Sequence, residues 1–450
     1  MTIRDARGEP VSAASTASLA AFEAALAQFN TYMDDPVATI DTALAEQPDF
    51  VMGHVLKAEL MISAWERSMS GAIRSTCDSL ATLRDKANAR ERGHIAAIAA
   101  WADGDWAGYK RQLDLVCMEH PRDLLALQAG HLSDFYHGDR ENLRGRVARA
   151  LPSWSADLPG YSYVLGMLAF GLEEAGDYGR AEETGRHALA LQPDDGWAQH
   201  AVAHVLEMQA RQPEAIAFME AGAGRWGRPG NAFAFHNWWH TALYNLDQGR
   251  IDRALEIYDT CIRPAPSEMQ LELVDAVAFL WRLHLRGIDV GDRWTGIAEI
   301  YARTGEEGFY VFNDMHAMMA YAATGRHGDA DRLLAEVERQ ALARGTNGDM
   351  ARAVGLPVIA AVHAFGRGDF AGATDLLLPI RTRTYPFGGS HAQRDIVQRT
   401  LIEAAHRAGR TALATGLLQE RVFLKPACPF SWNWLERVRG GNDSAVRAVA

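Results

Sequence analysis

Four short segments of the sequence gather side chains that can do chemistry. They are HAVAHVLE at 200–207, HNWWH at 236–240, FNDMHA at 312–317 and GGSHAQRD at 388–395. A packed all-helical chain usually fills such positions with leucine and alanine, because polar side chains are seldom buried. Each segment lies at a similar place in a different copy of one repeating unit. We therefore expect stacked copies to bring these side chains together around a polar site.

Helical spacing places the histidines in groups that share one face. His200, His204 and Glu207 follow the pattern i, i+4, i+7, and His236 and His240 form a second i, i+4 pair. Imidazole titrates near neutral pH, so it is the natural acid or base of an enzyme site. His236 and His240 are the first candidates for these two roles.

Roles follow from the chemistry of each side chain. Catalytic roles, in which imidazoles transfer protons and carboxylates orient them, are predicted for His236, His240, His204, His316, Asp314 and Asp395. Ligand-binding roles, through hydrogen bonds, charge or a flat ring, are predicted for His200, Asn237, Trp239, Asn313, His391, Arg394 and Asp275. Ser390 is expected to cap a helix whose exposed N-terminus, helped by Arg394, can hold an anion. This set of side chains suits a hydrolase or lyase that works without a metal or an organic cofactor.

Four interpretations of the polar residues stay open. They can satisfy helix ends and repeat interfaces, form an enzyme site for a small molecule, or line a peptide groove. A metal site is the fourth, with ligands from His200, His204 and Glu207, or from His236 and His240 with His316. The i, i+4 spacing permits a metal without diagnosing one, and no Glu follows the first His as in HExxH.

Two further sequence patterns limit how their side chains can be placed in the fold. Trp238 and Trp239 are adjacent, so one should face the repeat core and the other should lean toward a groove. Asp275 and Arg282 lie in the very apolar helix predicted at 273–285. They must be paired or hydrated, because burying an isolated charge costs several kcal/mol.

A repeating turn sets the framework for these side chains. The turn residues, each followed by a helical pattern, are Gly104, Gly138, Gly176, Ala210, Gly249, Gly287, Gly325, Gly368 and Gly409. Successive turns lie 34 to 43 residues apart. Glycine provides the left-handed cap that ends one helix, and a polar residue starts the next. Two amphipathic helices per period of this length are typical of tetratricopeptide-type solenoids.

The expected fold is all-α, a right-handed superhelix of tetratricopeptide-like hairpins. The candidate residues other than His391 lie 6 to 15 positions before their turns, on the first helix of each hairpin. First helices line the concave surface of such stacks, so one shared inner wall is expected. We predict a flexible N-terminus at 1–15, a single solenoid at 16–438 and a loosely held tail at 439–450.

The motifs WAQHAVAHVLEMQ, HNWWH, DVGDRW, FNDMHAMMA and QRDI are long and unusual in composition. Through them the chain resembles the tetratricopeptide repeat protein 38 family, over most of its length. The resemblance implies a superhelical stack of degenerate repeats. It implies no settled activity.

Composition limits the partners. The net charge of −12 is spread over mixed acids and bases, which argues against nucleic-acid binding. No secretory signal or membrane span is visible, and the four cysteines, with no CxxC pair, suit reduced thiols in the cytoplasm. The leading hypothesis is a protein that binds, and as a further option converts, a small molecule in a His-rich pocket on its concave face. The alternative is a non-catalytic scaffold for a peptide or protein partner. The oligomeric state stays open.

Overall fold

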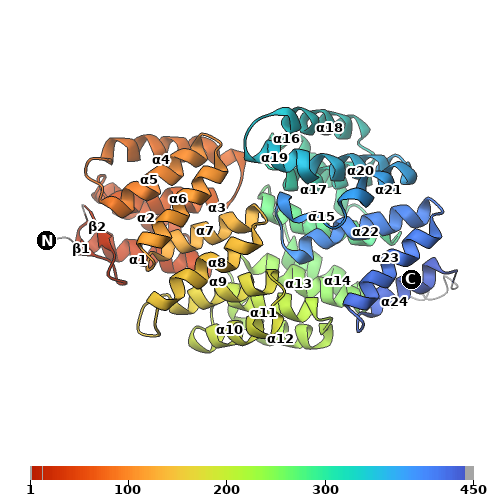
Figure 1. Cartoon of the computed structure of the whole chain (residues 1–450), viewed down its shortest axis with the longest axis horizontal. Coiled ribbons are helices and arrows are strands. Elements are labelled where there is room, and N and C mark those ends of the chain that lie inside the picture. Colours follow the sequence, from red (N-terminus) through yellow and green to blue (C-terminus); the bar gives the residue numbers. More distant parts are fainter. Residues whose placement is uncertain (1–2, 13, 441–450) are drawn as a thin grey trace. The chain divides into compact units, whose positions relative to one another are not determined.

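Helices, with the turns and loops that join them, make up nearly all of the chain in the computed structural model, which describes residues 3–12 and 14–440 (Figure 1). The exception among the described residues is a small hairpin of strands β1 (Ile3–Arg4) and β2 (Pro10–Val11). The all-α prediction is confirmed. No described helix is both long and apolar enough to cross a bilayer, and the four cysteines are free thiols.

The predicted turns lie where helices meet. All nine turn residues have positive φ, from 57° at Ala210 to 84° at Gly176. This left-handed conformation ends a helix and lets the chain reverse. The repeat read from the sequence therefore corresponds to a real structural period of helical hairpins.

The contacts group the chain into two compact units. Unit 1 comprises Met1–Val205, Gly222–Asn237 and Ala343–Asp349, and unit 2 comprises Leu206–Ala221, Trp238–Leu342 and Met350–Ala450. The single continuous solenoid and its right-handed path stay predictions.

Unit 1 is built mainly from ten helices in chain order. They are α1 (Thr16–Thr31), α2 (Pro36–Glu46), α3 (Val51–Ser63), α4 (Ser70–Leu83), α5 (Ala89–Ala102), α6 (Trp106–Glu119), α7 (Leu124–Tyr136), α8 (Arg140–Ala150), α9 (Tyr161–Glu174) and α10 (Tyr178–Leu191). Four helices contribute residues to both units: α11 (Gly196–Met208), α12 (Gln212–Trp226), α13 (Ala234–Asp247) and α19 (Thr346–Met350).

Unit 2 holds the remaining helices. They are α14 (Ile251–Ile257), α15 (Gln270–Leu285), α16 (Arg293–Thr304), α17 (Val311–Thr324), α18 (His327–Leu342), α20 (Leu356–Gly366), α21 (Phe370–Leu377), α22 (His391–Arg407), α23 (Thr411–Leu424) and α24 (Pro429–Val438). Short 3-10 or π segments are η1 (Arg67–Met69), η2 (Leu151–Ser153), η3 (Tyr258–Ile262), η4 (Ala351–Gly355), η5 (Leu378–Ile380) and η6 (Tyr385–Phe387).

Residues 3–12 of the N-terminal segment make ion pairs with the helices, while the flexibility expected for 1–15 stays a prediction. The buried Asp5 pairs with the buried Arg90 at 3.2 Å. Arg7 donates two hydrogen bonds to Glu23, at 2.7 and 2.8 Å. The polar composition of this segment concealed charges whose partners lie far along the sequence. Of the predicted loose tail, residues 441–450 lie outside the described residues.

Candidate functional site

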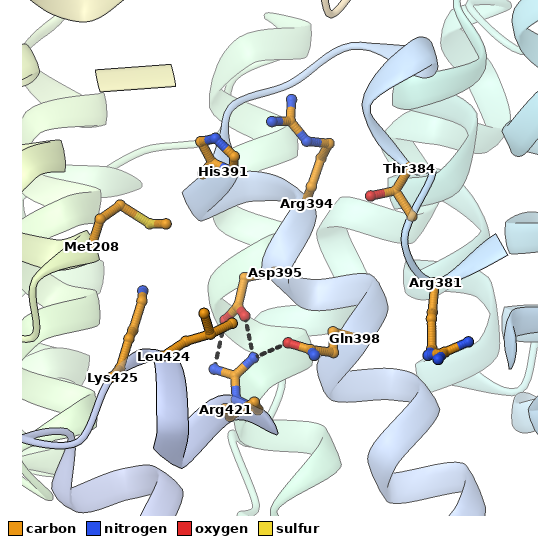
Figure 2. A pocket seen from close by; sticks show the side chains of 10 residues that line it. All are labelled: Met208, Arg381, Thr384, His391, Arg394, Asp395, Gln398, Arg421, Leu424 and Lys425. Carbon is orange, nitrogen blue, oxygen red and sulfur yellow. Dashed lines mark hydrogen bonds and ion pairs between the residues drawn. The ribbon is translucent and has the colours of Figure 1, made fainter. Parts of the chain in front are cut away.

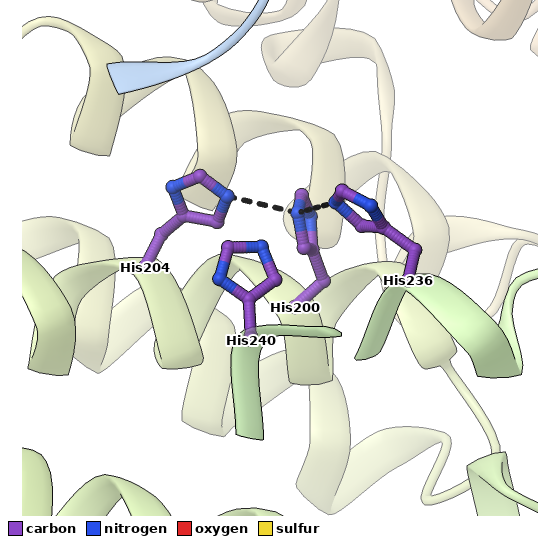
Figure 3. Close-up of side chains that lie close together, drawn as sticks. All are labelled: His200, His204, His236 and His240. Carbon is purple, nitrogen blue, oxygen red and sulfur yellow. Dashed lines mark hydrogen bonds between the residues drawn. The ribbon is translucent and has the colours of Figure 1, made fainter. Parts of the chain in front are cut away.

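Three histidines of unit 1 converge on one point. Helix α11 carries His200 and His204, and α13 carries His236. His204 Nε2 lies 2.9 Å from His200 Nε2, and His236 Nε2 lies 3.1 Å from the same atom. Figure 3 shows these rings together with His240, which follows His236 by one turn of α13. The expected convergence of His200 and His236 is therefore observed, while their chemical roles stay predictions.

Aromatic rings enclose this imidazole cluster. The rings of Trp197, Phe170 and Phe233 lie 4.9, 5.2 and 5.2 Å from that of His200, centroid to centroid. His200 is 2% exposed, His204 is fully buried and His236 is 9% exposed. Polar contacts are strong in surroundings that exclude so much water.

Two buried carboxyl groups outside the predicted set, Glu173 and Asp195, lie in unit 1, and Glu173 lies beside the cluster. Glu173, at the end of α9, places Oε2 3.6 Å from His204 Nδ1, and both side chains are fully buried. Asp195 accepts a hydrogen bond from the Ala198 amide at 2.9 Å, at the start of α11. Burial raises the pKa of Asp195 to about 7. In the sequence, the one feature that could have pointed to these two acids is their position at the ends of otherwise apolar helices.

Two other polar side chains of unit 1 help to define the surroundings of the cluster. His131, on α7, is fully buried against the rings of Phe170 and Trp197. Burial lowers its pKa to about 3, so it is neutral at physiological pH. Asn237 is 1% exposed and donates to the Gly196 carbonyl at 3.4 Å, which ties α13 to the start of α11. A ligand-binding role for Asn237 stays a prediction.

Unit 2 has a polar interior of its own. His240 Nδ1 lies 3.1 Å from Glu207 Oε2. Trp239 is fully buried, and the Arg282 guanidinium lies 5.4 Å from its ring centre. Trp238 is half-buried, in keeping with the expectation that two adjacent tryptophans face different surroundings. The buried Arg282 donates at 2.7 Å to the carbonyls of Ala278 and Ala392, and burial lowers its pKa to about 10.

Two candidates on α17, His316 and Asp314, are buried, and their chemical roles stay predictions. His316 is fully buried, and its Nδ1 lies 2.9 Å from the Phe312 carbonyl. Burial and the nearby Arg282 lower the pKa of His316 to about 4. Asp314 was expected to orient an imidazole, but it accepts the Gly308 amide at 2.9 Å and so holds the loop before α17.

Two further residues of unit 2, Asn313 and Asp275, were predicted to bind a ligand. Asn313 is half-buried on α17, and Asp275 is 1% exposed on α15. Their roles in ligand binding stay predictions.

A cavity of about 220 Å³ lies in unit 2 (Figure 2). It is lined by Met208, Arg381, Thr384, His391, Arg394, Asp395, Gln398, Arg421, Leu424 and Lys425. Three of these residues, His391, Arg394 and Asp395, are among those predicted to bind or act on a ligand. The lining contains four cationic side chains, Arg381, Arg394, Arg421 and Lys425, and a single carboxylate, Asp395.

That carboxylate, Asp395, is held by arginines, whereas the sequence analysis expected it to orient an imidazole. Arg399 donates to Asp395 Oδ2 at 2.5 Å. Figure 2 shows that Arg421 pairs with the same carboxylate and donates to Gln398, at 2.6 Å. Burial alone would raise the pKa of Asp395, but Arg421, Arg399 and Lys425 outweigh it and hold that pKa well below its usual range. Asp395 is therefore ionised at neutral pH and serves as a structural counter-charge.

The first turn of α22 forms part of the pocket wall. Ser390 caps the helix by accepting the Gln393 amide at 3.3 Å, while Gln393 Oε1 accepts the Ser390 amide at 3.0 Å. The predicted cap is confirmed. Arg394 donates to the Gly389 carbonyl, which fixes its guanidinium at this end of the helix. Arg381, Arg421 and Lys425 were not predictable as pocket residues, because no repeat position connects them with α22.

No family model matches the chain. Among solved structures it is similar to human IFIT1, a dimer with m7Gppp-AAAA, at 15% identity over 94% of this chain and 97% of that one, with a TM-score of 0.44. Yeast Tom70 gives 12% identity over 96% and 89% of the chains, with a TM-score of 0.37. Naa15/Naa10 bound to HypK-THB gives 14% identity over 96% and 79%, with a TM-score of 0.27.

Likeness at this level carries no statement about function. The fold itself is clear from the described helices: the chain is a tetratricopeptide-like helical-repeat protein.

Proposed function

We propose that the protein binds a small anionic molecule in the unit 2 pocket. The supporting observation is the composition of the pocket wall, in which Arg381, Arg394, Arg421 and Lys425 surround one cavity whose single carboxylate, Asp395, is already paired. Such a wall carries excess positive charge. A bound anion would relieve the mutual repulsion of these cations.

The side chains suit a carboxylate or phosphate. Guanidinium groups bind either one through two parallel hydrogen bonds, and an ammonium acts as a mobile point charge. The N-terminus of α22 adds amide dipoles of the same sign at the wall. The volume of about 220 Å³ is below the range of roughly 300–1,000 Å³ usual for drug-sized ligands. We therefore expect a small metabolite, or the charged end of a larger one.

Lys425 offers a specific test, because the chain has four lysines and the other three, Lys57, Lys86 and Lys110, are distant in sequence. Acetylation by a lysine-reactive reagent is followed by mass spectrometry, with inorganic phosphate and succinate as separate probes. Protection of Lys425 alone supports the proposal, and the probe that protects it distinguishes phosphate from carboxylate. Equal labelling of Lys425 with and without both anions contradicts the proposal.

Conversion of the ligand is a separate prediction. His391 is the imidazole of the pocket wall and can hold or move a proton beside a bound anion. The acid–base roles predicted for His236, His240 and His204 also stay predictions. Turnover of a metabolite panel that is lost on His391→Ala, or on His236→Ala, would place the chemistry in one unit or the other.

A peptide partner is the second candidate, and one observation favours it. At the end of α23, Phe423 is 86% exposed and Leu424, which lines the pocket, is 72% exposed. A peptide that places a carboxylate in the pocket would cover these apolar side chains. Phe423→Ser should weaken binding of such a peptide and leave phosphate and succinate binding unchanged.

Two further expectations accompany the proposed function. They are membership of the tetratricopeptide repeat protein 38 family and a cytoplasmic location.

A further inference from the structure

We propose that His200, His204 and His236 hold a divalent transition-metal ion in unit 1. This site is independent of the anion pocket, which lies in unit 2. The proposal depends on three observations: the convergence of three Nε2 atoms, a carboxylate behind one of the imidazoles, and a dry aromatic enclosure.

The spacing of the three nitrogens is close to that of metal ligands. Around a tetrahedral zinc ion with Zn–N bonds of about 2.0–2.1 Å, neighbouring ligand nitrogens lie roughly 3.3 Å apart. Nε2 of His200 lies 2.9 Å from that of His204 and 3.1 Å from that of His236. A shift of a few tenths of an ångström in each ring would admit an ion between them.

Hydrogen bonds alone cannot satisfy well the three Nε2 atoms that meet here. A neutral imidazole Nε2 carries either one proton or one lone pair in the ring plane, so it makes one strong hydrogen bond. His200 Nε2 meets two other Nε2 atoms at hydrogen-bond distance. A metal ion would accept the lone pairs of all three nitrogens at once, with each ring protonated at Nδ1.

Glu173 stands where a carboxylate supports a metal-binding histidine. Its Oε2 lies 3.6 Å from His204 Nδ1, the nitrogen that would remain protonated when Nε2 binds the ion. Carboxylate–histidine–metal contacts of this kind fix the ring orientation and raise the basicity of the ligand. Glu173 is fully buried, and its carboxylate form would also favour a cation at the cluster.

The donor set indicates the class of metal. Three imidazoles suit zinc, copper, iron or nickel, and they exclude the oxygen-preferring magnesium and calcium. Zinc with three protein ligands keeps a fourth position for water or a substrate. His236 is the most exposed of the three at 9%, so this side offers the open position.

A second donor set, Glu173 and Glu174 with His204, is also close enough to bind a metal, because its ligand atoms lie within 4.8 Å of one another. It would use neither His200 nor His236. Variants of these two histidines therefore separate the two sets.

The test is metal content and cobalt binding of the full chain. The protein is purified without chelator for elemental analysis, then stripped and titrated with Co²⁺, whose visible d–d absorption reports nitrogen ligation. We expect about one metal per chain in the wild type and in the control His187→Ala, which removes an exposed histidine of α10. His200→Ala and His236→Ala should lose both the metal and the cobalt spectrum. Glu173→Gln should bind about 10–100-fold more weakly.

Folding of each variant is checked by circular dichroism, and His200→Gln and His236→Gln serve where an alanine variant unfolds. Thermal unfolding gives a second measurement, because a metal bound only by the native state raises the melting temperature. Less than about 0.1 metal per chain together with no saturable Co²⁺ absorption would overturn the proposal. So would unchanged Co²⁺ affinity in the folded His200 and His236 variants, an outcome that points to the donor set of Glu173 and Glu174.

Discussion

Arg399 donates a hydrogen bond at 2.5 Å to Asp395, one turn earlier on α22. Arg399 also pairs with Asp247 at 3.1 Å, and Arg421 approaches Asp395 from α23. Asp395 thus joins Arg399 to Arg421, and Asp395 and Arg421 both line the anion pocket. It stabilises the fold and at the same time opposes an anionic ligand.

Replacing Asp395 should separate these two effects. Removing one partner of a buried ion pair costs about 3–5 kcal/mol, and Asp395→Asn should lie near the lower limit because its side chain is 18% exposed. The same change removes the competing carboxylate, so phosphate or succinate should bind more tightly. Urea unfolding and calorimetric titration measure the two quantities. Asp375→Asn, which breaks the exposed pair with Arg410, is the control and should change neither appreciably.

Asp195 should make the stability of the protein depend on pH in an unusual direction. Its pKa is raised to about 7 from 3.8, so the native state favours the protonated form. This contribution is fully present below about pH 3.8 and is lost as the pH rises through about 7. Asn resembles the neutral acid and is a good N-cap, so Asp195→Asn should keep the contact with Ala198.

The variant should therefore be more stable than the wild type above about pH 7, by the order of a few kcal/mol, and the advantage should shrink toward pH 4. Urea unfolding across this pH range measures the difference. An advantage that is constant with pH would contradict the assigned shift.

The repeat turns predict opposite effects for two matched substitutions. Ala210 has φ of 57° at a turn where the other eight copies of the repeat have glycine, and an L-residue in this conformation costs roughly 1–2 kcal/mol. Ala210→Gly should stabilise the protein by about 0.5–1 kcal/mol after the entropy of glycine is counted. Gly176, with φ of 84° and open space around its Cβ position, should lose about 1 kcal/mol on change to alanine. Thermal or urea unfolding that shows the same sign for both variants would refute the turn assignment.

The helical period was predictable because it is local. A left-handed glycine, a polar start and apolar spacing act within a few residues, so all nine turns from Gly104 to Gly409 were found from the sequence. The convergence of His200 and His236 was also predictable, because the two residues occupy similar positions in successive repeats.

Contacts that do not follow the repeat were not predictable. Arg421 and Lys425 reach the pocket from the end of α23 and just beyond it, whereas the candidate list was drawn from first helices only. Asp5 and Arg90 pair across 85 residues, which made the N-terminal segment look free in the sequence. Glu173 was hidden because a carboxylate at a helix end is usually a solvated residue.

The most direct measurement of the central claim is a calorimetric titration of the full chain with phosphate and with succinate. It compares the wild type with Lys425→Gln, which removes a pocket cation, and with Arg383→Gln, an exposed arginine outside the lining. We expect saturable binding of at least one anion that weakens about tenfold in Lys425→Gln, a change of about 1.4 kcal/mol, and is retained in Arg383→Gln. Absence of saturable binding for both anions, or equal affinity in all three proteins, would contradict an anion site in unit 2.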